Sequence, residues 1–236
     1  LHQRIEDSES DHRELADTVL RLLADAAPVD GTGLPHLPAW LGGLELPGAD
    51  GDRWPADELL LPGSPLQAVL VDDSPFGTVA DSAVAEYGAA PLRALGAGWV
   101  FSVVVDELPT GPDHDLPDEE QWWAQCELPP ERLVAVRDLD LVDPDRWPAA
   151  LELLAGQPEL APLLTGPDGY THWWLRRYAE IDGRPLRGWR SLDRPDWTGL
   201  FEPLTEPWAA GLGGLLAGDL PDDGGDQAHY EGQGDG

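Results

Sequence analysis

The residue types best suited to binding chemistry gather in one stretch of the chain. Six arginines fall between positions 176 and 194, and five aromatic residues fall between positions 173 and 197. Guanidinium groups pair with carboxylates in a bidentate manner and stack on indole rings. This pattern predicts either an interaction surface for an anionic, aromatic or acidic partner, or internal packing against the chain's own acids. The candidate surface residues are Trp173, Trp174, Arg176, Arg177, Arg187 and Trp189.

Two adjacent tryptophan pairs, Trp122–Trp123 and Trp173–Trp174, stand out among the 11 tryptophans of the chain. In an extended segment, neighbouring side chains point to opposite faces. We therefore expect one ring of each pair in the core and the other exposed. Exposed tryptophan often marks an interface, whereas the alternative for these rings is packing in the core and in turns.

Several catalytic machines are excluded because the residues they need are missing. The chain has no lysine, so it can form neither a Walker A phosphate loop nor a Schiff base. Neither a G-x-S-x-G nucleophile elbow nor an H-E-x-x-H zinc motif occurs. Carboxylates are too numerous for any pair to be selected by sequence. We assign no catalytic, cofactor-binding or metal-binding residue and expect no enzyme in this chain.

Two further residues have specific alternatives. His114 lies between Asp113 and Asp115, an arrangement that suits either a cation site or a solvated acidic loop. Cys126 is the single cysteine, so no internal disulfide forms, and we interpret it as an ordinary buried or half-buried thiol.

The charge restricts the class of partner. Against 14 arginines stand 45 acidic residues, which gives a formal net charge of −31. Such a chain repels phosphate, so we expect binding to neither nucleic acid nor anionic membranes. The acidic surface maintains solubility or recognises a basic partner. The sequence lacks an apolar run of membrane-spanning length and a signal-peptide pattern, and we expect a cytoplasmic protein. A start at Leu1 and the absence of methionine indicate a fragment of a larger protein.

The pattern of apolar residues predicts an α+β fold of mixed short strands and helices with a disordered acidic C-terminal tail. We expect a helix over 15–26 with Ser10 or Asp11 as its cap, a helix over 81–87 that stops at Gly88 and a helix over 148–155 that stops at Gly156. We also expect a central strand over 99–105, a strand over 133–136 and a hairpin turn at 181–183, flanked by segments 171–175 and 184–189. The expected organisation is an α+β region over 1–106, an acidic Pro-rich linker or loop over 107–130, a second α+β region over 131–218 and a tail over 219–236.

Five longer segments together are similar to one known kind of protein region: ELADTVLRLLAD (14–25), LPAWLGG (37–43), WPADELLLPGSPL (54–66), VAVRDLDLV (134–142) and WWLR (173–176). Their sequence resembles the region that follows the ATPase domain in actinobacterial sacsin/Hsp90-like ATP-binding proteins. The resemblance implies a parent chain with an ATP-binding domain that uses an asparagine to hold magnesium. This chain contains no asparagine, so the implied nucleotide site lies outside it.

The resemblance implies a non-catalytic accessory region of a chaperone-type ATPase, with a role in scaffolding, interdomain coupling or client contact. Its partners would be proteins, either the parent's ATPase domain or clients, and it would hold no cofactor. The alternative from the residues themselves is a free-standing acidic binding module that uses the Trp/Arg strip. A carboxylate-based hydrolase is the second alternative.

Overall fold

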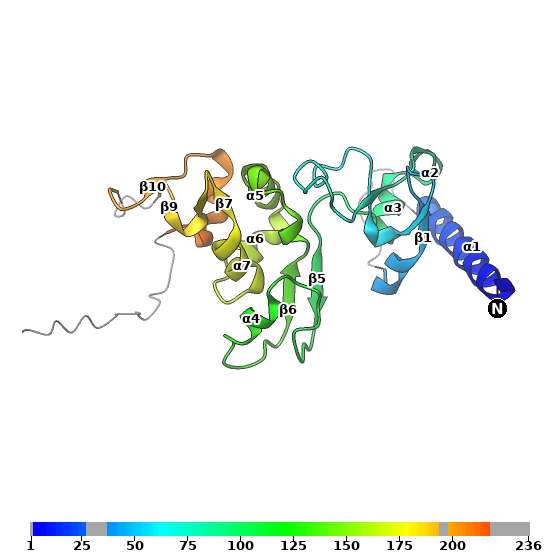
Figure 1. The fold of residues 1–236 in the computed structure, drawn as a ribbon, viewed down its shortest axis with the longest axis horizontal. Helices are drawn as coiled ribbons and strands as arrows, with labels where there is room; N and C mark the ends of the chain where they lie inside the picture. Colours follow the sequence, from blue (N-terminus) through cyan, green and yellow to red (C-terminus); the bar gives the residue numbers. More distant parts are fainter. Residues whose placement is uncertain (1, 27–36, 194–197, 218–236) are drawn as a thin grey trace, which may run out of the picture.

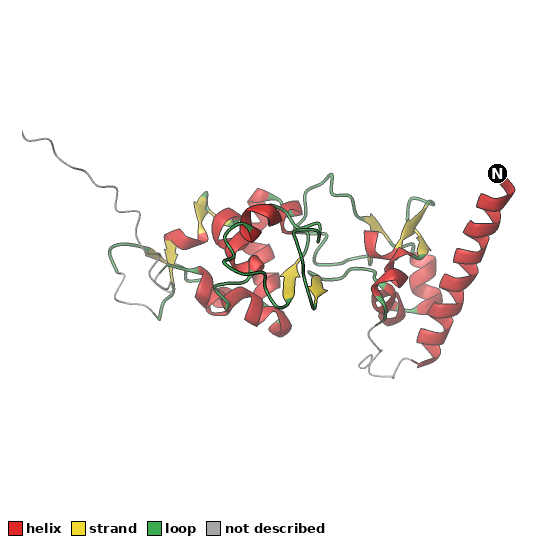
Figure 2. Ribbon diagram, turned by 90° about the horizontal axis from the view of Figure 1, so that it is seen from below, coloured by secondary structure: helices red, strands yellow, loops and turns green. Residues whose placement is uncertain are grey.

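The computed structural model describes residues 2–26, 37–193 and 198–217, and the expected acidic tail over 219–236 lies outside them. The fold is α+β, as predicted. None of the helices in these ranges is long and apolar enough to cross a bilayer. The helices are α1 (His2–Ala26), α2 (Asp81–Tyr87), α3 (Ala89–Leu95), α4 (Glu119–Trp123), α5 (Trp147–Ala155), α6 (Ala161–Thr165) and α7 (Tyr170–Tyr178). Short 3-10 turns separate many of these elements. Figure 2 shows the helices and the short strands joined by long loops.

The strands are short and form two-stranded sheets throughout the described ranges. Three sheets are antiparallel: β1 (Glu45–Pro47) with β2 (Arg53–Pro55), β5 (Val103–Asp106) with β6 (Leu133–Val136), and β7 (Glu180–Ile181) with β8 (Arg184–Pro185). Two are parallel: β3 (Leu59–Leu60) with β4 (Gly77–Thr78), and β9 (Trp189–Arg190) with β10 (Glu202–Pro203). Such small sheets cannot form a core alone, so the helices supply most of it.

Buried apolar side chains form two clusters. The first cluster joins α1, α3 and the strands near residue 46, with Leu20, Leu46 and Leu92 at its centre. The second joins β6, α5, α6 and α7, with Leu151 and Leu175 among its fully buried members. Figure 1 shows the same division, with α1, α2 and α3 at one end of an elongated molecule and α4 to α7 at the other.

Three consecutive leucines connect the two clusters. Leu59 and Leu61 belong to the first cluster, whereas Leu60, between them, belongs to the second. Neighbouring residues of an extended segment point to opposite sides, so β3 can serve both cores at once. A backbone hydrogen bond reinforces this junction, because Val79 of the first cluster donates to the Leu60 carbonyl at 2.9 Å.

The expected helices are present, and one is longer than predicted. α2 ends at Gly88, which has φ of 81°, and α5 ends before Gly156, as their glycine stops predicted. The first helix begins at His2, so the prediction of a start near residues 10–11 was wrong. Segment 2–26 contains no glycine or proline to interrupt it, and its residues favour helix.

The strand predicted over 99–105 is shorter, covers only Val103–Asp106, and is not central. β5 pairs with β6, Val103 opposite Val136, and with no other strand of the described ranges. Val103 and Val105 are 38% and 47% exposed, while Phe101 is buried before the strand begins. An apolar run therefore indicated strand correctly, but it could not indicate how many partners the strand finds.

The hairpin turn is confirmed, but one flanking element is not a strand. Asp182 and Gly183 have φ of 52° and 70°, the two left-handed residues that a tight two-residue hairpin requires. Residues 171–175 belong to helix α7 instead of a strand. Tyr170 and Trp174 are both buried and stand four residues apart, so helical periodicity governs this segment.

Segment 107–130 packs on the second cluster and is not simply an exposed linker. It contains α4, and it buries Leu116 and Trp122 among the second cluster's residues. The hydroxyl of Tyr170 donates to the Pro117 carbonyl at 2.5 Å, which joins the segment to α7. Pro and acidic residues dominate its composition, yet two apolar anchors are enough to fix it.

Leu151→Ala should lower the free energy of unfolding by about 2–5 kcal/mol, because it leaves a cavity in the second cluster. Leu151 is fully buried. The matched control is Leu153→Ala on the same helix, where the side chain is only half-buried, and we expect less than about half that loss. Urea unfolding measures both; equal losses would contradict this placement of α5.

Candidate functional site

Helix α7 separates its residues between the core and the surface. Tyr170, Trp174 and Leu175 are buried, with 0%, 5% and 0% of their surface exposed. Trp173, Arg176 and Arg177 follow the i, i+3, i+4 spacing that places side chains on one helical face, and they line a pocket. Burial of one face of α7 therefore presents an indole and two guanidinium groups on another.

The pocket has a volume of about 700 Å³, within the range of sites that hold organic ligands. We call it the Arg/Trp pocket. α4 and the turn after it supply one wall, α7 supplies another, and Pro167, Asp168 and Arg187 complete it. Leu128 in the first wall is 79% exposed, so the pocket opens to solvent. The wall from α4 and its turn comprises Trp122, Gln125, Cys126, Glu127, Leu128 and Pro130.

The Trp173 ring is held at both ends. Its Nε1 donates to Gln125 Oε1 at 3.2 Å across the pocket wall. The Arg177 guanidinium lies 5.7 Å from the Trp173 ring centroid and 5.9 Å from that of Tyr178, within cation–π range. These contacts restrict the orientation of Arg177 without neutralising its charge.

Arg177 and Arg187 are exposed, and neither forms an ion pair with any residue that the structure describes. Other arginines of the stretch have internal partners. Arg184 donates to Glu202 at 2.9 Å, and Arg190 donates to the Phe201 carbonyl at 3.2 Å. Internal pairing, the simpler alternative for the strip, therefore applies to part of it. The pocket also contains Glu127 and Asp168, so its lining carries both signs of charge.

His172 is among the residues that line the pocket, but its side chain is buried. Its Nδ1 lies 2.8 Å from the Leu164 carbonyl, which can only accept, so Nδ1 carries the proton. Burial lowers the His172 pKa, and Arg176 adds to this effect, so the ring is neutral and Nε2 keeps its lone pair. Nε2 is buried and has no hydrogen-bond partner among the described residues. Sequence reasoning missed His172 because no motif surrounds it.

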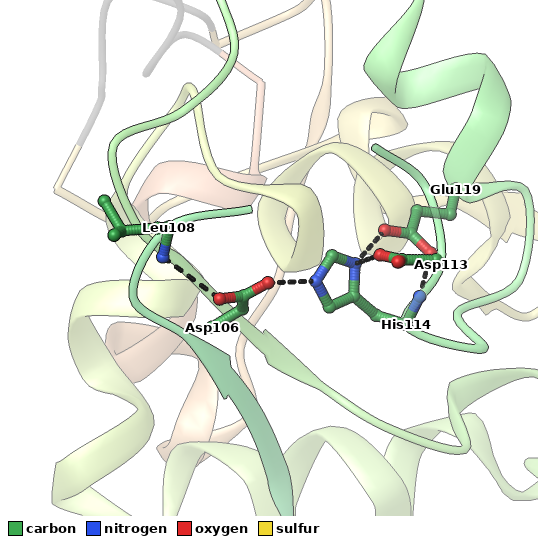
Figure 3. Close-up of polar contacts among 5 residues, drawn as sticks. All are labelled: Asp106, Leu108, Asp113, His114 and Glu119. Carbon is green, nitrogen blue, oxygen red and sulfur yellow. Dashed lines mark hydrogen bonds and ion pairs between the residues drawn. The ribbon is translucent and has the colours of Figure 1, made fainter. Parts of the chain in front are cut away.

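A histidine in the loop that leads to α4 meets carboxylates from β5 and α4 (Figure 3). The His114 ring lies between two carboxylates: Nε2 is 3.0 Å from Asp106 Oδ2, and Nδ1 is 2.5 Å from Glu119 Oε1. Glu119 also accepts the backbone N–H of His114 at 3.0 Å. We call these three residues the carboxylate–histidine cluster. It joins the end of β5 to the first residue of α4.

The surroundings of His114 favour the charged form of its ring. Burial lowers its pKa, but hydrogen bonds to Asp106 and Glu119 and the field of nearby carboxylates outweigh burial and raise it overall. The backbone N–H of Leu108, followed by His114, lowers the pKa of Asp106. Both ring nitrogens lie against carboxylates, and in the charged form neither nitrogen keeps a lone pair for a metal ion or a proton.

Neither sequence alternative for His114 describes what the structure shows. The side chain is 7% exposed, so it does not lie in a solvated loop. No group of three or more potential ligands in the described ranges is arranged to hold a metal ion. Glu119 itself is 5% exposed, and the imidazolium supplies the positive charge that a buried carboxylate needs.

The cluster and the pocket share helix α4. Glu119 opens the helix, and Trp122, three residues later, lines the pocket. The Trp122 ring meets Tyr170 of α7 edge-on, with centroids 5.8 Å apart and planes at 88°. The Glu119–His114 contact and the Trp122–Tyr170 contact therefore both hold α4, and with it this wall of the pocket.

Cys126 also lines the pocket but is not activated. Burial, with a smaller contribution from Asp168, raises the pKa of its thiol. Its Sγ lies 3.6 Å from the Trp122 carbonyl, an ordinary i, i+4 contact. It is half-buried, as predicted, and a protonated thiol is a poor nucleophile.

Four of the six candidate residues meet in the pocket, namely Trp173, Arg176, Arg177 and Arg187. Trp174 does not lie on a surface but packs in the core. Its ring centroid is 4.9 Å from that of Tyr178 and 6.0 Å from that of Trp147. Trp189 is half-buried outside the pocket lining, under the Arg184 guanidinium at 4.8 Å. Each tryptophan pair has one buried ring and one half-buried ring, although both pairs are helical and not extended.

Comparison with known proteins finds no family model, no curated protein and no solved structure that matches this chain.

His114→Gln should destabilise the fold more at about pH 5.5 than at about pH 8.5, because the imidazolium exists only below its raised folded-state pKa. The contribution is complete below the unfolded pKa and is lost as pH rises through the folded one. Hydrogen bonds to charged groups contribute about 1.5–3 kcal/mol, which sets the scale of the loss at low pH.

The measurement is urea unfolding of both proteins at the two pH values. Asp113→Asn is the matched control: its carboxylate lies 3.6 Å from His114 Nδ1 but is 76% exposed, so we expect a change within about 0.5 kcal/mol. A loss for His114→Gln that does not depend on pH would show that the ring acts only by filling space.

Proposed function

We propose that this chain is a non-catalytic protein-interaction region whose docking site is the Arg/Trp pocket, and that the pocket binds an acidic segment of a partner protein. The observation that carries this proposal is the pair of exposed arginines, Arg177 and Arg187, without a carboxylate partner in the described ranges. Although the chain has 45 acidic residues, none that the structure describes pairs with these two arginines, and both guanidinium groups can meet a carboxylate of another chain at the pocket.

The chemistry of the lining supports a protein segment over a nucleic acid. Arginine binds carboxylates through paired N–H groups, and aromatic rings with arginine are the usual centres of protein interfaces. A polyanion would meet the net charge of −31 beyond the pocket, and Glu127 and Asp168 within it. A short acidic segment places its charge at the arginines and avoids most of this repulsion.

The proposed context is a cytoplasmic accessory region of a sacsin/Hsp90-like chaperone-type ATPase. The partner segment then belongs to the ATPase domain of the parent chain or to a client protein. This context rests on the resemblance of the quoted segments, while the pocket supports protein contact independently of it. The same pocket serves the free-standing binding module that the Trp/Arg strip suggested, since the docking chemistry is identical.

The carboxylate-based hydrolase has one observation in its favour. Burial raises the pKa of Asp138, and Asp140 and Asp115 nearby add to this effect, partly offset by Arg137. A hydrolase needs such an acid facing a second carboxylate across a cleft. Asp138 is absent from the lining of the Arg/Trp pocket, so we propose contact and not catalysis.

Arg177→Ala and Trp173→Ala should each weaken binding of an acidic peptide by about tenfold or more, since each removes a contact with the ligand or its support. The probe is a labelled hexapeptide of alternating Glu and Leu with both ends blocked, and fluorescence anisotropy measures its affinity. Arg177 is exposed, so Arg177→Ala should keep its free energy of unfolding within about 1 kcal/mol. Trp173 is half-buried against the second cluster, so Trp173→Ala should lose more, and its affinity is measured under conditions in which it remains folded.

Arg132→Ala is the matched control, because Arg132 is also exposed but pairs with Glu107 at 3.0 Å, outside the pocket lining. It should bind the peptide as the unaltered protein does. Equal losses in all three variants would reduce the interaction to general charge attraction and remove the pocket as the docking site.

A further inference from the structure

We infer that the Arg/Trp pocket is occupied in cis by the chain's own segment 219–223, and that an acidic segment of a partner must displace it. The sequence of this segment is Asp-Leu-Pro-Asp-Asp, and it lies just beyond the described residues. The inference rests on the proposed function and adds to it a competitor that the chain itself carries. The place of attachment, the charge and the unpaired arginines of the pocket support it.

The chain leaves the second cluster beside the pocket. Leu215 and Leu216 are fully buried. The Ala217 backbone N–H donates to the Trp189 carbonyl at 2.6 Å, and Trp189 is two residues beyond Arg187, which lines the pocket. Two residues span at most about 7 Å and paired strands lie about 5 Å apart, so the backbone of Ala217 lies within about 12 Å of that of Arg187.

Segment 219–223 can reach the pocket from this attachment. Asp219 is two residues beyond Ala217, and Asp223 is six residues beyond it. Six residues span up to about 20 Å, which exceeds the distance of at most about 12 Å to Arg187. The hydrogen bond of Ala217 can therefore stay intact while the segment lies in the pocket.

The charges of the segment and the pocket are complementary. Residues 218–236 contain six acidic residues and no arginine, and three of the acids fall within 219–223. Arg177 and Arg187 form no ion pair with any residue that the structure describes. Arginine binds carboxylates through paired N–H groups, so these acids supply the partners that the described part of the chain does not.

The order of residues in the segment also suits the pocket. Leu220 and Pro221 stand between acids, and the pocket sets Trp173, Leu128 and Pro130 beside its arginines. An apolar pair flanked by carboxylates can cover these apolar side chains while its acids meet the guanidinium groups. The charge is confined to a short stretch, which limits its contact with the acidic residues of the lining.

Attachment to the same chain overcomes the general repulsion. A net charge of −31 opposes the approach of any separate acidic segment, including that of a second copy. A tethered segment has an effective concentration on the order of millimolar. If its own dissociation constant is about half that value, it fills the pocket about two-thirds of the time and weakens the apparent affinity for an external ligand about threefold.

The first experiment removes charge from the segment in the full chain. A proximal variant combines Asp219→Asn, Asp222→Asn and Asp223→Asn. The matched distal variant combines Asp226→Asn, Glu231→Gln and Asp235→Asn, which removes the same charge farther from Ala217. We expect the proximal variant to bind the blocked Glu/Leu hexapeptide about threefold more tightly than the unaltered chain, and the distal variant to bind it within about 1.5-fold of the unaltered chain.

Arg177→Ala adds a second readout, because it removes a contact of the hexapeptide and of the segment alike. In the unaltered chain it also releases the segment, which returns part of the affinity that it removes. We therefore expect its loss of hexapeptide affinity to be about threefold larger in the proximal variant than in the unaltered chain. Equal losses would show that the segment does not occupy the pocket.

The second experiment uses Cys126, the single cysteine, which lines the pocket. Leu220→Cys adds a thiol to the segment, and Gln233→Cys is the matched control farther along the chain. With diamide as the oxidant at about pH 9, where thiolates form, we expect an intrachain disulfide at least about fivefold faster for Leu220→Cys. Adding Arg177→Ala should abolish that difference, and mass spectrometry distinguishes intrachain from interchain disulfides.

The outcomes separate this inference from the proposed function. If the hexapeptide binds through Arg177 but the proximal and distal variants bind it equally, the inference is wrong and the docking site stands. A fast disulfide that Arg177→Ala leaves unchanged, or one formed mainly between two chains, also overturns the inference. An Arg177-dependent intrachain disulfide without any hexapeptide binding keeps the contact in cis and removes the partner. If neither the hexapeptide binds nor the disulfide is faster, both proposals fail.

Discussion

The burial of one face of α7 is the constraint from which the rest of the site follows. Tyr170, Trp174 and Leu175 enter the second cluster. The hydroxyl of Thr171, also on α7, accepts the Val136 backbone N–H of β6 at 2.9 Å. Because a helix is rigid, fixing these residues also fixes the direction of the others. Trp173, Arg176 and Arg177 must then face the turn after α4. The core thus places the site.

Helix α4 is too short to hold itself in place, so its environment must do so. Helices this short gain little from their own hydrogen bonds in water. At its first residue, Glu119 is bonded to the charged His114 ring; on its inner side, Trp122 packs on Tyr170. The same helix carries a wall of the Arg/Trp pocket, so the Glu119–His114 contact and that wall lie on one element. The buried carboxylate of Glu119 therefore attaches the start of α4 to the loop that carries His114.

The sequence predicted local features better than partnerships. Glycine stops at Gly88 and Gly156 and the turn at Asp182–Gly183 depend on backbone preferences of single residues, and they were predicted correctly. The number of partners of β5, by contrast, depends on what reaches its free edge, which no local pattern records. The strip of arginine and tryptophan indicated four pocket residues for the same local reason, since charged and aromatic types gather there. His172 and the contact of His114 with Asp106 depend on tertiary packing, and only the structure could reveal them.

The charge of the chain imposes an order on recognition at the pocket. At long range, a net charge of −31 repels any acidic partner, so steering cannot speed its arrival. At physiological ionic strength, that repulsion fades beyond about 8 Å, whereas contacts within the pocket are screened much less. Affinity must therefore come from close geometry: a carboxylate against Arg177, and an apolar side chain against Trp173. Such a balance favours ligands that carry their charge on one compact group, and it disfavours partners with extended acidic surfaces.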